Sequence, residues 1–554
     1  MNPVTMRLKR LLLNRHTLFL AGLYLYLRLT DPLIEWTPGV WRMEIPLMLY
    51  FFFVWNAWVR ESRWQPVIAA GFMAVPYLVH DYYFLRFFRI PKINDLAQIP
   101  ELIAVLGPTG NLMLIAAFGA VAYLLVAFLR FSWRAALLSI PGVIILALPF
   151  VHPLSYIQMF SAFSYELIHY ATVVNVEKNG RLATALYNEA KRRDTFSHID
   201  QYRDISQLNL TLPPDLEKPE KANGRNVHLI VMEGFLDPTL LKGLPQSIRP
   251  VHPDLTRLLG NRQGLSVSPV FGGYTSQAEF EVLCGVPAYQ EFDEIEFNVF
   301  SGAETYCLPR ILHRLGYHTM ASNGFKPDFF NTIPAYRGLG FDAVYFSKEY
   351  TPTEETYLTK GEDQDNKYFF DADMFTQNLA FVKQRMADKK PFLNYVLTVY
   401  GHFPFELGNR VGPMLFKETG LPWDLERIVN QHHYRSKALA DYLKQLLALD
   451  PHSLIVLVSD HLPPLEGGFE TYNRFGYLQP EISDRFHRNR FIVFRDGQVE
   501  THPVFYHYNI YRMILDYVTN QEYCKVKSCD FGYPLPKDAL RDDYRILMGL
   551  ASRH

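Results

Sequence analysis

Hydrophobic and polar residues are distributed unevenly along the chain. Five apolar runs lie near the N-terminus, at about 17–30, 44–59, 66–85, 111–129 and 135–152. A helix needs about 20 mostly apolar residues to span a bilayer, and tilt or flanking aromatic side chains allow a shorter one to do so. Buried core helices are the alternative, but so many runs in so short a stretch favour membrane spans. The pattern predicts a five-span transmembrane domain over residues 1–155.

From residue 226 onward, apolar β-rich runs alternate with amphipathic helical patterns. "NVHLIVME", "PFLNYVLTVYGH" and "SLIVLVSDH" are strand-like, and "DADMFTQNLAFVKQRMA" and "RSKALADYLKQLLAL" have helical spacing. Near-continuous apolar strands separated by helices indicate a mostly parallel sheet covered on both faces. We therefore expect an α/β domain over 225–554. Connecting helices and a linker rich in Pro, Lys and Glu are expected over 156–224.

Charged residues indicate how the chain is oriented. Basic residues precede the first apolar run and also lie in two short loops, at Arg60, Arg63, Arg130 and Arg134. The positive-inside rule places these segments in the cytoplasm, so an odd number of spans puts the α/β domain outside. The formal net charge of −1 gives no footprint of nucleic-acid binding.

The cysteines agree with an outside location, because all four follow the apolar region. They are Cys284, Cys307, Cys524 and Cys529. An oxidising compartment permits disulfides, and four cysteines allow three pairings. Proximity in the sequence favours Cys284–Cys307 and Cys524–Cys529, with buried free thiols as the alternative.

Residues of metal-ligand type follow three of the expected strands. Glu233 ends the first strand, His402 lies near the end of the second, and Asp460 and His461 end the third. Ligands of open α/β sheets bind beyond the carboxyl ends of the strands. Taken singly, these residues could be helix caps or a loop histidine. Together they predict a site for one divalent ion, Mn²⁺, Mg²⁺ or Zn²⁺.

The segment "GGYTSQAEFEVLCG" places Thr275 after a glycine-rich turn and before a helical pattern. Thr or Ser at such a position is commonly a helix cap. The alternative is a nucleophile, which for a threonine hydroxyl requires a metal ion or a base beside it. The neighbouring metal-ligand residues favour the nucleophile, with Ser276 as the competing candidate.

These segments resemble the lipoteichoic acid synthases and related phosphoglycerol transferases of the alkaline phosphatase–sulfatase superfamily. "GYTSQAEFEVLCGVP" resembles the nucleophile segment, "HLIVMEGF" the first metal-ligand strand, "VSDH" the Asp-His metal pair and "YGHFPF" the substrate-side histidine motif. "LGFDAVYF" matches a further segment of the family. The resemblance implies that Thr275 is the nucleophile and that Glu233, Thr275, Asp460 and His461 bind the metal ion. It also implies substrate contacts at His402, Asn323, Phe330 and Asn331.

The implied function is that of a transferase in a bacterial inner membrane, with its catalytic domain on the periplasmic or extracellular side. It would move phosphoglycerol from phosphatidylglycerol, through a phosphothreonine, onto a glycan or glycolipid. Phosphoethanolamine transfer is the first alternative. The family's Trp-Asn-Arg stretch here reads Phe330-Asn331-Thr332 without the arginine, and the Cys284–Cys307 pair is more like phosphoethanolamine transferases.

The sequence also bears on three further functions. A phosphodiesterase would use water as the acceptor and remains open. A non-catalytic scaffold has no need for the whole ligand set. A sulfatase is disfavoured, because neither "CGVPA" nor "CLPRI" matches the C-x-P-x-R element in which sulfatases form formylglycine.

Overall fold

The computed structural model describes most of the chain from residue 37 onward. The described residues are 37–553 without 63, 88–89, 168–171, 261, 263, 328, 350–356, 361–367, 418–419, 528, 530 and 532–539. The chain divides into two units, residues 1–197 and 198–554, which are described separately.

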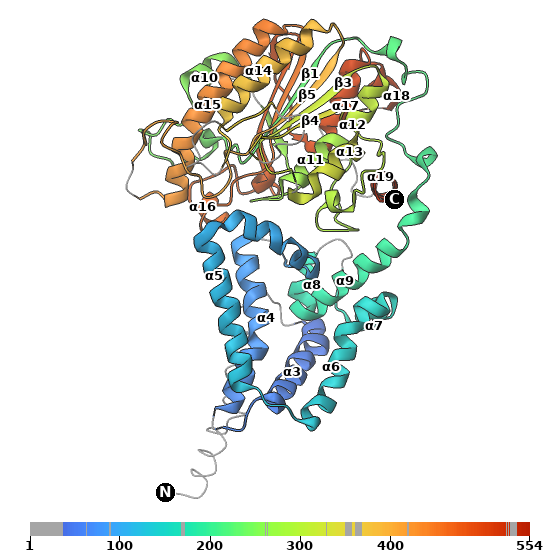
Figure 1. Ribbon diagram of the computed structural model, residues 1–554, viewed down its shortest axis with the longest axis vertical. Helices are drawn as coiled ribbons and strands as arrows, with labels where there is room; N and C mark the ends of the chain where they lie inside the picture. Colours follow the sequence, from blue (N-terminus) through green and yellow to red (C-terminus); the bar gives the residue numbers. More distant parts are fainter. Residues whose placement is uncertain are drawn as a thin grey trace, which may run out of the picture. The chain divides into compact units, whose positions relative to one another are not determined.

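The first unit is helical in its described part (Figure 1). Its principal helices are α3 (Ile45–Trp58), α4 (Gln65–Phe87), α5 (Ile99–Phe128), α6 (Trp133–Val151), α7 (Pro153–Phe163), α8 (Thr172–Asn179) and α9 (Arg181–Ser197). The last four of the expected apolar runs correspond to α3, α4, α5 and α6. The first run, 17–30, lies outside the described residues.

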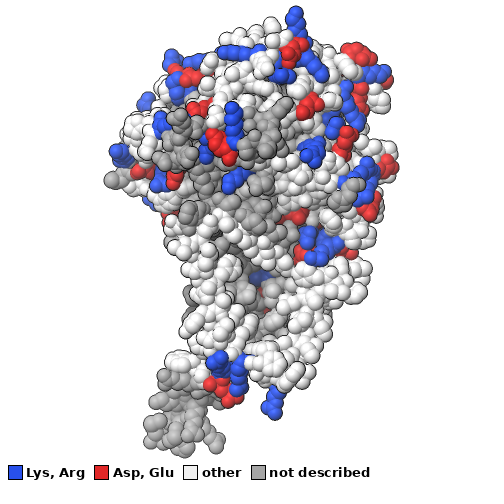
Figure 2. Space-filling model, in the orientation of Figure 1, with Lys and Arg blue, Asp and Glu red and all other residues white. Residues whose placement is uncertain are grey.

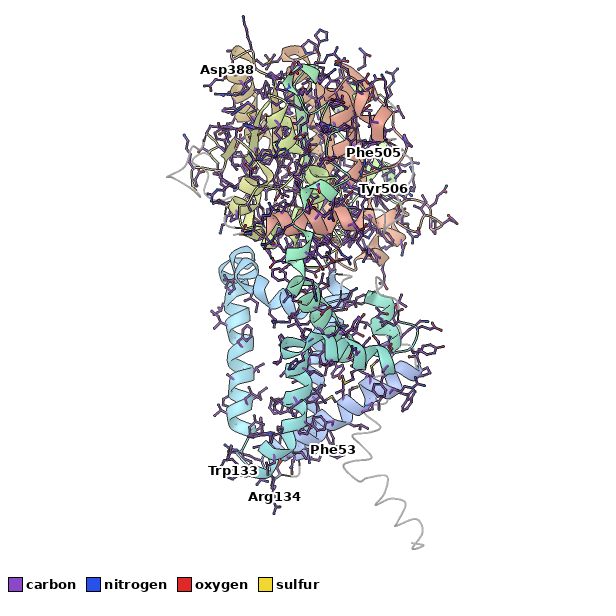
Figure 3. All side chains as sticks on the ribbon, turned by 90° about the vertical axis from the view of Figure 1, so that its right-hand side faces the viewer. Phe53, Trp133, Arg134, Asp388, Phe505 and Tyr506 are labelled. Atoms are coloured by element: carbon purple, nitrogen blue, oxygen red, sulfur yellow. A yellow bond between two sulfur atoms is a disulfide. The ribbon has the colours of Figure 1, made fainter. Side chains whose placement is uncertain are left out.

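One helix of the described residues, α6, is both long and apolar enough to cross a membrane. Apolar side chains are exposed on α4, α5 and α6: Val67, Val126, Leu137 and Val143 are each more than 60% exposed, and Val79 is 60% exposed. Figure 2 shows this unit as largely uncharged, with Lys, Arg, Asp and Glu gathered mainly on the other unit. At one end of the helices, Trp133 is 75% exposed and lies beside Arg134 (Figure 3).

The segment expected to connect the two domains is divided between the units. Tyr156 and Phe160 of α7 pack with Leu186 and Tyr187 of α9 in a core of the first unit. Residues 208–216, part of the expected linker, instead contribute four leucines to the core of the second unit. The structure thus places the division after residue 197, because these apolar side chains are buried on either side of it.

The second unit is built on a nine-stranded sheet in the order β4-β3-β5-β1-β6-β7-β2-β9, with β8 paired to β7. The strands are β1 (Val227–Met232), β2 (Gly264–Val267), β3 (His318–Asn323), β4 (Ala343–Tyr345), β5 (Phe392–Leu397), β6 (Leu454–Ser459), β7 (Arg488–Arg495), β8 (Gln498–Glu500) and β9 (Phe505–Tyr506). Strands β4, β3, β5, β1 and β6 run parallel, whereas β7 is antiparallel to β6 and β2. The expected α/β class with a mostly parallel sheet is confirmed.

Helices cover both faces of this sheet (Figure 1). They are α10 (Pro253–Leu259), α11 (Thr275–Cys284), α12 (Leu308–Arg314), α13 (Thr332–Leu339), α14 (Asp371–Ala387), α15 (Trp423–Leu449), α16 (Phe469–Arg474), α17 (His507–Val518), α18 (Glu522–Lys527) and α19 (Arg541–Ala551). Alternate residues of β1 face two cores. Leu229 and Val231 pack with residues of α11, α12 and α17, and Ile230 with residues of α14 and α15. Burial on both faces explains why the strand reads as a continuous apolar run.

Both disulfides favoured by sequence proximity are present. Cys284, the last residue of α11, is bonded to Cys307, which precedes α12. The second bond joins Cys524 and Cys529. The first disulfide fixes the end of the helix that begins at Thr275.

Candidate active site

Strand register brings the two candidate carboxylates together. Met232 of β1 pairs with Ser459 of β6, so the following residues, Glu233 and Asp460, leave the centre of the sheet side by side. Strand β5 flanks β1 on its other side in parallel, and His402 follows its end. The carboxyl ends of three neighbouring strands therefore supply this site.

A left-handed turn carries Thr275 to the same edge. Gly272, Gly273 and Tyr274 all have positive φ, at 73°, 149° and 63°. Tyr274 is the N-cap residue of α11 and forms no side-chain cap, so the capping role does not fall to Thr275. The Oγ1 atom of Thr275 instead lies 2.8 Å from Oε2 of Glu233 and 2.8 Å from Oδ2 of Asp460.

His461 completes the cluster. Its Nε2 lies 3.5 Å from Oε1 of Glu233 and 3.3 Å from Oδ2 of Asp460. Its Nδ1 lies 2.9 Å from the carbonyl oxygen of Leu462, which is positioned to accept the Nδ1 proton. Such a hydrogen bond orients a histidine ring so that the other nitrogen can bind a metal.

Burial of this cluster changes the proton affinity of its members. Burial and, after it, the neighbouring Glu233 carboxylate raise the pKa of Asp460 to about 7. Burial lowers the pKa of His461, but the carboxylates of Asp460 and Glu233 raise it by more, so the net direction is upward. Asp460 thus holds its proton because its charged form is poorly solvated, whereas His461 holds its proton because two carboxylates face it.

A divalent cation fits these residues. The ligand atoms of Glu233, Asp460 and His461 lie within 4.8 Å of one another. Nε2 of His461 is buried without a hydrogen-bond partner among the described residues. Thr275 carries one hydroxyl proton for two carboxylate neighbours, so the second close oxygen pair needs either another proton or a cation. Carboxylate, hydroxyl and imidazole groups suit Mg²⁺, Mn²⁺ or Zn²⁺.

The family follows from the sequence of this whole unit. The sulfatase family model matches residues 225–519, which include every member of the cluster. The chain belongs to the sulfatase family. Its place in the alkaline phosphatase–sulfatase superfamily confirms the resemblance seen in the motifs.

Relatives and solved structures extend this comparison. Over 265 residues the chain is 27% identical to a Rhizobium meliloti (strain 1021) protein named for cyclic β-1,2-glucan modification, covering 47% of this chain and 38% of that protein. It is 25% identical over 309 residues to a lipoteichoic acid synthase of Staphylococcus aureus (strain bovine RF122 / ET3-1), covering 54% of this chain and 43% of the synthase. The matched segments thus span about two fifths of these relatives. The Streptococcus pyogenes phosphoglycerol transferase GacH aligns with a TM-score of 0.45 and 15% identity, covering 65% of this chain and 92% of that chain.

In this sulfatase-family protein, the loop after β5 packs directly against the cluster. A Cβ atom at Gly401 would lie 2.0 Å from the carbonyl oxygen of Glu233. Only glycine permits this approach, which brings the neighbouring His402 to the site. The ring of His402 is partly buried, with Nδ1 2.8 Å from the hydroxyl of Tyr368.

The other expected substrate residues have structural hydrogen bonds. Asn323 ends β3, is 2% exposed, and donates to the hydroxyl of Tyr336 over 3.3 Å. The amide of Asn331 donates to the carbonyl oxygens of Phe297 and Phe300, 2.7 and 2.8 Å away. These two side chains therefore hold the fold around the site.

Phe330 differs, because its side chain is partly exposed. Its ring lies nearly parallel to that of Tyr274, with an interplanar angle of 17° and centroids 6.1 Å apart. Beyond it lies Thr332, which the motif resemblance matches to an arginine of the lipoteichoic acid synthases. Its hydroxyl donates to the carbonyl oxygen of Phe329, so the position supplies no positive charge.

Two residues that support the site were not predicted from the sequence. Asn489 of β7 donates to Oγ of Ser459 over 2.7 Å and to the carbonyl oxygen of His461 over 2.9 Å. Glu279, one turn after Thr275, accepts hydrogen bonds from Tyr336 and Tyr395, and burial raises its pKa to about 7. Asn489 carries no motif, and Glu279 reads as an ordinary polar residue of an amphipathic helix.

Proposed function

We propose that this protein transfers phosphoglycerol from phosphatidylglycerol, through a phosphothreonine at Thr275, to a glycan or glycolipid acceptor. The observation that carries the proposal is the position of the Thr275 hydroxyl, 2.8 Å from both Glu233 and Asp460. Similarity to a lipoteichoic acid synthase supports the donor. Similarity to a protein named for cyclic β-1,2-glucan modification supports a glycan acceptor.

In the first half-reaction, Oγ1 of Thr275 forms a bond to phosphorus and the bond to the diacylglycerol oxygen breaks. The hydroxyl proton passes toward the carboxylate that accepts it and ends on the departing diacylglycerol. A divalent ion bound by Glu233, Thr275, Asp460 and His461 would lower the pKa of this hydroxyl and offset charge on the phosphoryl oxygens. His402 lies at the same sheet edge, suited to contact those oxygens.

In the second half-reaction, an acceptor hydroxyl oxygen forms a bond to phosphorus and the bond to Oγ1 breaks. The acceptor's proton restores the Thr275 hydroxyl, so the two steps balance. The site then returns to its starting state. Water in place of the acceptor would make the protein a phosphodiesterase.

We further propose that residues 1–155 anchor the protein in a bacterial inner membrane as a multi-pass domain, with 225–554 as the periplasmic or extracellular catalytic domain. Residues 156–224 would connect them. The exposed apolar side chains of α4, α5 and α6 support a lipid environment, since soluble surfaces rarely present such a large apolar patch. A reporter fused after residue 160 should be active only outside the cytoplasm, and one near residue 62 only inside. The reverse result would contradict this orientation.

One observation favours phosphoethanolamine as an alternative headgroup. The motif resemblance matches Thr332 to an arginine of the lipoteichoic acid synthases. The hydroxyl of Thr332 donates a hydrogen bond to the carbonyl oxygen of Phe329. This position therefore offers no cation to a glycerol phosphate. Vesicles of phosphatidylglycerol or phosphatidylethanolamine, offered separately, would show which lipid yields diacylglycerol.

The test of the covalent step uses the full chain in such vesicles. Digestion and mass spectrometry should find the headgroup phosphate on Thr275. Thr275→Ala should abolish diacylglycerol release, whereas loss of a helix cap alone would cost only about 1 kcal/mol of stability. Ser276→Ala is the matched control, because Ser276 is the buried neighbouring hydroxyl. Loss of activity in Ser276→Ala but not in Thr275→Ala would move the assignment, and activity in both would refute the covalent mechanism.

A further inference from the structure

A row of aromatic rings begins at the residue before Thr275. The ring of Tyr274 lies beside that of Phe330. The ring centroids of Phe330 and Phe329 are 4.1 Å apart, and those of Phe329 and Phe325 are 4.5 Å apart. The ring of Phe325 in turn lies nearly parallel to that of His402, with an interplanar angle of 18° and centroids 6.2 Å apart. We call Tyr274, Phe330, Phe329, Phe325 and His402 the aromatic row. All five side chains are partly exposed, so the row forms a surface between the proposed nucleophile and the proposed substrate histidine.

The backbone holds the start of this row in a disfavoured conformation. Tyr274, Phe330 and Asn331 have φ values of 63°, 48° and 56°. For a bulky residue such a conformation costs about 1–3 kcal/mol and persists where the surroundings enforce it, often at functional sites. Asn331 supplies the restraint, because its amide is bonded to two backbone carbonyl groups. Two aromatic rings are thus fixed beside Thr275 while both remain accessible to solvent.

Four of the five rings in the row, those of Tyr274, Phe330, Phe329 and Phe325, present uncharged aromatic faces. Residues 329–332 are Phe, Phe, Asn and Thr, so this stretch brings no charge to the surface. An anionic phosphate is better matched to the cluster at Glu233, Asp460 and His461 with its cation. A sugar ring suits the row instead, because its apolar C–H face can lie on an aromatic ring while its hydroxyl groups remain hydrated at the rim.

We propose that the aromatic row binds a sugar residue of the glycan acceptor, stacked on Tyr274 and Phe330. This inference rests on the proposed function and identifies the acceptor half of that site. The stacked sugar presents a hydroxyl group to the phosphothreonine. Its oxygen bonds to phosphorus, the bond to Thr275 Oγ1 breaks, and the proton returns to Thr275. The sugar also covers the phosphothreonine from water, which favours transfer over hydrolysis.

Calorimetric titration tests the binding step. The protein is the full chain in detergent carrying Thr275→Ala, so that no turnover occurs, and the probe is a β-1,2-glucan oligosaccharide. Aromatic contacts contribute roughly 0.5–1.5 kcal/mol, which corresponds to an increase in Kd of about 2- to 13-fold. We expect Tyr274→Leu and Phe330→Leu each to raise the Kd for the glucan by about this factor. Tyr274→Phe and Phe330→Trp should restore binding, since they retain a ring.

Phe486→Leu is the matched control. Phe486 is also partly exposed, and its ring stacks on that of Phe469 with centroids 4.4 Å apart and an interplanar angle of 10°. It lies outside the aromatic row. The Phe486→Leu variant should bind the glucan with the same Kd as the parent protein. Thermal melting of each variant separates lost binding from lost folding.

Three results would overturn the inference. The first is an unchanged glucan Kd in both leucine variants, and the second is no glucan binding by the parent protein. The third is an equal loss of binding for glycerol phosphate, titrated as a second probe, because the row would then recognise the donor headgroup. Failure of the proposed function is distinguishable: the native chain would release no diacylglycerol from either lipid and form no phosphothreonine, whatever the glucan titration shows.

Discussion

Replacing Gly401 by alanine perturbs the site through one methyl group. The added Cβ would lie 2.0 Å from the carbonyl oxygen of Glu233 and 2.2 Å from Nη1 of Arg435. Carbon and oxygen normally approach no closer than about 3.3 Å, so the loop and Glu233 have to separate by about 1 Å. Arg435 cannot yield easily, because it is buried and its Nε lies 2.6 Å from Oδ2 of Asp371.

The expected cost follows from the displacement of Glu233. A misplacement of about 1 Å in a catalytic constellation can reduce the rate by about 10²-fold. This corresponds to about 2.7 kcal/mol in the activation barrier. We therefore expect Gly401→Ala to reduce diacylglycerol release by about two orders of magnitude and to weaken metal binding.

The assay compares initial rates in vesicles, bound metal per chain and thermal melting. Gly264→Ala is the matched control, since a Cβ there comes no closer than 3.4 Å to the carbonyl oxygen of His502. Its activity should remain within about twofold of the native chain. The reasoning would be refuted by near-native activity of Gly401→Ala, or by an equal loss in Gly264→Ala.

Three further predictions concern stability and the metal site. Cys307→Ser opens the loop that the disulfide to Cys284 closes across a sequence separation of 23. This change should lower the free energy of unfolding by roughly 3 kcal/mol. An unchanged melting temperature of the variant in detergent would contradict this expectation. Burial raises the pKa of Glu281 to about 8 from 4.5, so the folded state retains a proton that the unfolded chain loses. Stability from this group is therefore full below about pH 4.5 and falls as the pH rises toward about 8, and Glu281→Gln should stabilise the protein more at pH 8 than at pH 5. Equal shifts in melting temperature at both pH values would rule this out. Asn489→Ala removes the hydrogen bond to the carbonyl oxygen of His461. This change should raise the Kd for the metal by about 10- to 100-fold. An unchanged metal titration would show that Asn489 does not position this loop.

The sequence determined features that depend on neighbouring residues. Continuous apolar runs identified β1, β5 and β6, because strands buried on both faces carry few polar residues. The polar residues that end those runs marked Glu233, Asp460 and His461 as candidates. Short separations between cysteines favoured the pairings that the structure contains. The division of the connecting segment was not evident, because a leucine in a Pro-rich stretch does not reveal which core buries it.

Only the tertiary structure decided how distant segments meet. The register of β1 with β6 places Glu233 beside Asp460, and hydrogen bonds across the sheet do not follow from either strand alone. Nothing in the sequence indicated that the amide nitrogen of Asn331 donates to two backbone carbonyl groups, because those groups belong to a distant segment. Gly401 looked like a turn residue, and its importance arises from the Glu233 carbonyl oxygen that lies where a side chain would be. Local sequence thus supplied the chemical groups, whereas their distances, burial and proton affinities depend on contacts between residues far apart in the chain.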